Sequence, residues 1–240
     1  MRISGVSTFL VGNPWKNWLF VRVDTDEGLY GVGEGTLNAF SATVETAIHE
    51  LKDAYIGQDP TGIELIVQRM TRDVYSEGGQ IHGPAVAAIE VACWDIIGKS
   101  VGLPVHKLLG GAMRERTRAY ANGWYRTERT PEAFAAAARD VAGRGYTAMK
   151  FDPFGAAWRV QERREEDLSI EIVAAVREAV GDEVDLFIEG HNRFSVSTAL
   201  RIAERLAEFR PGWFEEPVAH QNMGAMVEVA HRSPVPVATG

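Results

Sequence analysis

The strongest constraint on the fold is a regular alternation of short apolar segments and amphipathic segments that begins near Thr117. Strands are expected at 118–125, 146–151, 184–188, 212–214 and 234–238. Between them, apolar residues recur every three or four positions, the period of a helix packed on one side. Strands spaced roughly 25–40 residues apart are typical of βαβ units with right-handed crossovers, and therefore of a parallel sheet.

The first part of the chain follows a different order, with strands first and helices afterwards. Strands are expected near 3–11, 18–23 and 29–32, with a turn at Asn13-Pro14, and helices near 44–55, 60–70 and 84–99. This order is typical of an α+β domain. We therefore expect an α+β domain at 1–115 and a βα domain at 116–240.

Five strands are too few to close a (β/α)₈ barrel, which typically takes about 250 residues. Because the sequence stops at Gly240, directly after a strand, we expect these residues to be the first part of a truncated barrel. The alternative is an open, doubly wound sheet. No Gly-x-Gly-x-x-Gly turn is present in the sequence to support a dinucleotide site in such a sheet.

Charge and cysteine content narrow the function classes. With 25 Lys and Arg against 33 Asp and Glu, the net charge is −8, which disfavours nucleic acid and anionic membranes as partners. The single cysteine, Cys93, allows no internal disulfide and fits a reducing compartment. The N-terminus lacks the pattern of a secretion signal, and no apolar run approaches the ~20 residues of a membrane span. A soluble, cytoplasmic protein is expected.

Ionisable residues stand at the ends of three successive strands. Lys150 and Asp152 end one strand, Glu189 and His191 the next, and Glu215 the third. The carboxyl ends of parallel strands open into one shared mouth, where βα proteins place their active sites. Charges at the end of a buried strand are costly unless they are paired or bound to a metal. These residues are therefore the candidate site.

Glu189 and Glu215 offer hard oxygen atoms 26 residues apart on adjacent strands, and Mg²⁺ prefers such ligands. A further step of 26 would place a third ligand just after Gly240. Salt bridges at the rim of the sheet explain the same glutamates equally well. Spacing alone leaves both interpretations open.

His191 and Lys150 are the candidate catalytic side chains. On an extended chain His191 would point to the same side as Glu189 and could act as a general acid near neutral pH. A structural histidine or an additional ligand is the alternative. Lys150 could bind a substrate carboxylate, or act as a base if its pKa is lowered. The alternative for Lys150 is a simple ion pair with Asp152.

Taken together, these strand ends resemble the mandelate racemase and muconate lactonizing branch of the enolase superfamily. The resemblance covers the whole chain. It rests on the Lys-x-Asp, Glu-x-His and Glu-Glu-Pro strand ends and on segments 18–23, 25–28, 33–35, 92–99 and 104–111. It implies an α+β capping domain followed by a modified (β/α)₇β barrel of the TIM type. The cap would cover the barrel mouth, so that Trp15, Lys16 and 36–38 would help to bind substrate, although plain surface turns explain these loops as well.

The resemblance also implies roles for the site residues. Glu189 and Glu215 would be the first two Mg²⁺ ligands, although aspartate is more usual at the first position, and the third would follow Gly240. The Glu-x-His end resembles galactonate and mannonate dehydratases, in which the histidine protonates the departing hydroxyl, so His191 inherits that role. Lys150 matches the first lysine of a Lys-x-Lys pair. Asp152 replaces the second and would help to bind substrate, and the general base is expected beyond Gly240.

The implied activity is dehydration of a sugar acid to a 2-keto-3-deoxy acid by a homo-oligomeric enzyme. Two rival functions stay open. One is a racemase, epimerase or cycloisomerase with the same metal site. The other is an inactive fragment, because an incomplete barrel leaves an open sheet edge that could pair with another chain.

Overall fold

The computed structural model describes residues 1–12, 16–75 and 78–239. The chain divides into two compact units, Met1–Glu115 and Arg116–Gly240. The expected turn at Asn13-Pro14 and the candidate substrate contact Trp15 lie outside the described residues. Each unit has its own hydrophobic core.

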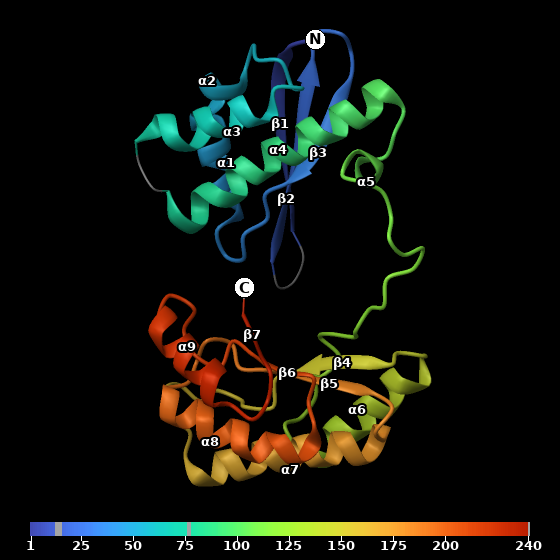
Figure 1. Ribbon diagram of the computed structural model, residues 1–240, viewed down its shortest axis with the longest axis vertical. Helices are drawn as coiled ribbons and strands as arrows, with labels where there is room; N and C mark the ends of the chain where they lie inside the picture. The colour runs from blue at the N-terminus through green and yellow to red at the C-terminus, as the bar shows by residue number, and fades with distance from the viewer. Residues whose placement is uncertain (13–15, 76–77, 240) are drawn as a thin grey trace. The chain divides into compact units, whose positions relative to one another are not determined.

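The described part of the first unit contains an antiparallel sheet in the order β1-β2-β3. Its elements are β1 (Ile3–Gly12), β2 (Asn17–Thr25), β3 (Tyr30–Glu34), α1 (Ser41–Glu50), α2 (Lys52–Tyr55), α3 (Ile63–Thr71), the 3₁₀ turn η1 (Arg72–Val74), α4 (Gly79–Val101) and α5 (Val105–Leu108). Leu19, Val21 and Val23 are fully buried because alternate residues of β2 face one side. Helices α1 and α4 cover that side (Figure 1).

Helix α4 is the centre of the first core. It begins at Gly79, five residues before the expected start at Pro84, and ends at Val101, where Gly102, with a φ of 68°, provides a left-handed cap. By length and composition alone α4 is long and apolar enough to cross a membrane, and 44% of its most apolar window is buried inside the protein. Its buried apolar residues belong to the core of the first unit. The helix packs so closely against β3 that a Cβ on Gly31 would lie 1.9 Å from the Ala92 carbonyl oxygen.

The described part of the second unit contains a parallel sheet in the order β4-β5-β6-β7. Its elements are α6 (Pro131–Gly143), β4 (Ala148–Phe151), α7 (Arg163–Val180), β5 (Asp185–Glu189), α8 (Val196–Leu206), η2 (Ala207–Phe209), β6 (Trp213–Glu215), α9 (Met223–Arg232) and β7 (Val237–Ala238). Helices α6, α7 and α8 lie on one side of the sheet (Figure 1). The predicted βα alternation and parallel sheet are confirmed, whereas closure into a barrel stays a prediction.

The expected strand at 118–125 is wrong as a continuous element. Only Ala121 pairs with the sheet, in an isolated parallel bridge to Met149. Gly123, with a φ of 72°, turns the chain away directly after this bridge. The segment that the sequence predicted to be a strand therefore pairs with the sheet at one residue, Ala121.

The register of the sheet places the candidate site. Glu189 on β5 is directly opposite Glu215 on β6. Phe151, Ile188 and Phe214, which alternate with the site residues along their strands, are fully buried in the core. Consequently the carboxylates of the two glutamates are presented together on the other face of the sheet.

Candidate active site

Glu189 and Glu215 converge on a single cation, the ammonium group of Lys150. Lys150 Nζ donates to Glu189 Oε2 at 2.9 Å and also to Glu215 Oε1. The Lys150 and Glu189 side chains are 9% and 7% exposed, and the Glu215 side chain is 22% exposed. The remaining carboxylate oxygens are also bonded, because the His191 backbone N–H donates to Glu189 Oε1 at 2.9 Å and Trp213 Nε1 donates to Glu215 Oε2 at 2.8 Å.

Burial and these hydrogen bonds set the protonation of the cluster. Burial raises the pKa of the Glu189 carboxyl above its ordinary value. Burial opposes ionisation of Glu215 too, but hydrogen bonds from Lys150, Glu189 and Trp213 outweigh it and lower the pKa of Glu215. Burial works to lower the pKa of Lys150, but the two carboxylates outweigh it and raise that pKa. In this arrangement Lys150 is a firmly charged cation, which suits carboxylate binding better than proton abstraction.

His191 is held by a second ion-paired cluster next to the first. Its Nδ1 lies 2.7 Å from Asp152 Oδ2, and this hydrogen bond raises the pKa of His191 above its ordinary value. Arg193 binds the same carboxylate oxygen, and the Phe154 backbone N–H donates to Asp152 Oδ1 at 2.9 Å. The Asp152 and Arg193 side chains are each 10% exposed, whereas that of His191 is 55% exposed.

Two details of the sequence-based interpretation are wrong. The alternative of a Lys150–Asp152 ion pair fails because Lys150 binds Glu189 and Glu215, while Asp152 binds His191 and Arg193. The extended chain assumed at His191 ends at Glu189, and His191 has a φ of 48°. The direction of the His191 side chain is therefore set by a left-handed loop conformation and not by the alternation of side chains along a strand.

Lys16 was the other candidate substrate contact that the structure describes. Lys16 Nζ lies 3.8 Å from the centre of the Trp18 ring in the first unit, and its role in substrate binding stays a prediction. Sequence reasoning missed Trp213 and Arg193. Trp213 stands two residues before Glu215, so the strand period could have identified it. Arg193 lies in a loop, where no periodic signal exists.

The donor set suits a divalent cation in part. Two opposed carboxylates already gather around a positive charge, and carboxylate oxygens are the ligands that Mg²⁺ prefers. Among residues 1–12, 16–75 and 78–239, no group of three or more His, Cys, Asp or Glu side chains could hold a metal. Glu189 and Glu215 are two carboxylates of the kind that Mg²⁺ binds, and their role as metal ligands stays a prediction.

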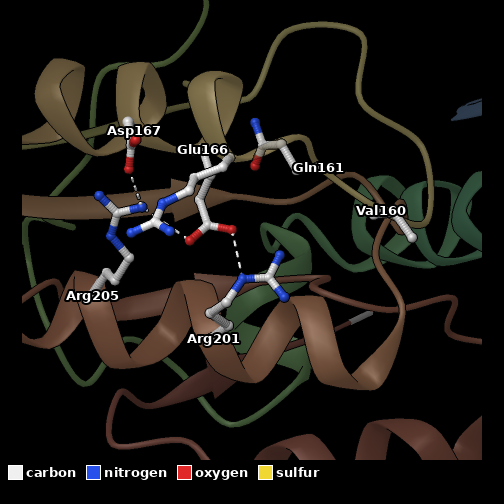
Figure 2. Close-up of a pocket in the computed structure, with 7 residues that line it drawn as sticks. Val160, Gln161, Glu166, Asp167, Arg201 and Arg205 are labelled. Carbon is white, nitrogen blue, oxygen red and sulfur yellow. Dashed lines mark hydrogen bonds and ion pairs between the residues drawn. The ribbon is translucent and has the colours of Figure 1, made fainter.

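A separate hollow of about 760 Å³ lies where α7 meets α8 (Figure 2). Four of its charged side chains are paired with one another: buried Glu166 binds Arg201 and Arg205, and Arg205 also binds Asp167. None of the candidate site residues that the structure describes lines this hollow. It is an ion-paired groove on the helical layer, distinct from the strand-end site.

An α+β unit followed by a parallel βα sheet with acidic residues at successive strand ends is the organisation of enolase-superfamily enzymes. Comparisons with known proteins agree. Residues 13–110 match the mandelate racemase / muconate lactonizing enzyme N-terminal domain, and residues 133–240 match the enolase C-terminal domain-like family. The chain belongs to the mandelate racemase/muconate lactonizing enzyme family of this superfamily.

Individual relatives support this membership. D-gluconate dehydratase of Thermoproteus tenax is 38% identical over 87% of this chain and 42% of its own length. D-galactonate dehydratase of Pectobacterium atrosepticum is 33% identical over 100% of this chain and 61% of its own. A mandelate racemase/muconate lactonizing enzyme structure from Jannaschia sp. CCS1 superposes with a TM-score of 0.93 at 33% identity, covering 100% of this chain and 67% of that one. The chain thus spans about three fifths or less of these curated relatives.

Proposed function

We propose that this chain is the front part of a Mg²⁺-dependent dehydratase of sugar acids. The observation that carries the proposal is the convergence of Glu189 and Glu215 on one cation, with His191 bound to Glu189 through its backbone N–H. The named relatives, which dehydrate D-gluconate and D-galactonate, support the same substrate class.

In the proposed reaction, Glu189 and Glu215 would hold the metal. Magnesium, when bound, supplies positive charge that stabilises the negative charge developing on the substrate as its α-proton leaves. Lys150 would bind the substrate carboxylate. His191 would protonate the β-hydroxyl, so that water leaves and a 2-keto-3-deoxy acid forms. The base that removes the α-proton is expected beyond Gly240.

The remaining expectations belong to the same proposal. A complete (β/α) barrel, assembly into a homo-oligomer, a cytoplasmic location and independence from nucleic acid and membranes fit a metabolic enzyme of this family. A racemase, epimerase or cycloisomerase is the second candidate, since it would use the same strand-end carboxylates.

The test is a screen of an acid-sugar library for 2-keto acid formation, carried out on a chain as long as the curated relatives, because the base is expected beyond Gly240. We expect activity with Mg²⁺, loss of activity with EDTA, and loss of activity in Glu215→Gln. His191→Asn should block dehydration while exchange of the α-proton with solvent deuterium continues. Exchange without water loss in the wild type would favour the isomerase, and EDTA-resistant dehydration would overturn the metal-dependent mechanism.

A further inference from the structure

The loops after β4 and β5 meet where His191 contacts Asp152. This contact decides which ring nitrogen of His191 is available to a substrate. An ionised carboxylate only accepts hydrogen bonds, and a guanidinium only donates them. Asp152 Oδ2 accepts a hydrogen bond from Arg193 Nη2 and lies 2.7 Å from His191 Nδ1. Arg193 Nη2 lies farther from Nδ1, at 3.2 Å, so we assign the proton on Nδ1 to the shorter contact, in which Nδ1 donates to Asp152. Nε2 is consequently the nitrogen that can exchange a proton with a substrate.

Contacts between these loops also stabilise an unfavourable backbone conformation at His191 and Asn192. His191 and Asn192 have φ values of 48° and 60°, in the left-handed region that most residues avoid. Such conformations persist only where the surroundings hold them, and they collect at functional sites. Here two neighbouring loops hold them: the Asn192 backbone N–H donates to the Glu216 carbonyl, after β6, at 2.8 Å, and Arg193 binds Asp152 and the Gly155 carbonyl, after β4.

From this geometry we infer that Arg193 and Asp152 are positioning residues that hold His191, with Nε2 toward the substrate, for proton delivery to the leaving hydroxyl. The inference rests on the proposed dehydratase function and assigns Asp152 a role other than substrate contact. In the step itself, a base outside these residues takes the α-proton. The electron pair of the broken Cα–H bond then forms the Cα=Cβ bond. The Cβ–O bond breaks as Nε2–H protonates the oxygen, and water departs.

A substrate with a fluoride leaving group distinguishes a loss of His191 positioning from general damage to the structure. Fluoride departs without being protonated, so elimination from a 3-deoxy-3-fluoro sugar acid yields the same keto acid without an acid catalyst. Arg193→Gln should reduce water elimination from D-gluconate or D-galactonate about a hundredfold, the usual order for losing a general acid, while fluoride release stays within about threefold. Arg193→Lys, which keeps a cation beside Asp152, should recover part of the loss.

Two further comparisons decide the outcome. Adding Arg193→Gln to His191→Asn should cause no further loss of the residual water elimination or of fluoride release, because the arginine acts through the histidine. Arg177→Gln is the matched control, since Arg177 also binds backbone carbonyls, those of Phe209, Gly181 and Val184, and it should leave the water-to-fluoride ratio unchanged. Equal loss of water and fluoride elimination in Arg193→Gln, or an additional loss in the double variant, would overturn the inference.

A readout independent of activity distinguishes this inference from the proposed function. In a crystal structure of Arg193→Gln, the His191 ring should leave its position 2.7 Å from Asp152. An unmoved ring would overturn the positioning role even if the wild type dehydrates sugar acids. Conversely, a wild type that forms no keto acid would refute the proposed function, whatever the ring does.

Discussion

Replacement of Lys150 by methionine tests whether the two strand-end carboxylates depend on a cation. Methionine keeps most of the length of the lysine side chain but removes the ammonium group. Glu189 and Glu215 would then face each other across adjacent strands without the positive charge that now binds both. Two unneutralised carboxylates in a largely buried site are costly.

The structure sets the size of the effect. Removing one partner of a buried ion pair costs about 3–5 kcal/mol. Lys150 and Glu189 are buried, but Glu215 is 22% exposed and retains its bond from Trp213, so we expect the lower end, about 3 kcal/mol. Mg²⁺ should restore part of this stability: a ligand present at 100 times its Kd stabilises the folded state by about 2.7 kcal/mol.

The assay is urea unfolding of wild type and variant in EDTA and in a Mg²⁺ series. Arg232→Met is the control, because it removes an exposed ion pair with Glu228 in the same unit and should cost well under about 1 kcal/mol. A loss for Lys150→Met no larger than that of the control would refute the idea that the carboxylates need a cation. A loss of about 3 kcal/mol that Mg²⁺ does not reduce would show that the cluster is structural and does not bind the metal.

Two further predictions concern the first unit. Gly31→Ala should destabilise it by about 3 kcal/mol or more in the same urea assay, because the new Cβ would lie 1.9 Å from the Ala92 carbonyl oxygen. Gly5→Ala is the control: a Cβ there has nothing within 4 Å, and the free energy of unfolding should change by no more than about 0.5 kcal/mol. Burial raises the pKa of Cys93 to about 12, so its thiolate population at pH 8 falls about a thousandfold. A thiol reagent should label Cys93 only in denaturant, and rapid labelling of the native protein would contradict this burial.

Much of the candidate site was predictable because strand ends are local features. Glu189, Glu215 and Lys150 each follow an apolar run, and parallel strands bring such ends to one edge. The partners were less predictable. Asp152 was expected either to contact substrate or to pair with Lys150, yet it binds Arg193, which lies 41 residues away in a loop without periodicity.

The sequence by itself determined the order of elements and the division into an α+β part and a βα part, because the periods of buried residues are properties of short segments. It also determined which strands end in charged side chains. Only the tertiary structure decided how those charges pair. Strand register set Glu189 opposite Glu215, and the left-handed backbone at His191 turned its ring toward Asp152. The strand register and the direction of the His191 ring both depend on contacts between segments far apart in the chain, and a local sequence pattern does not predict such contacts.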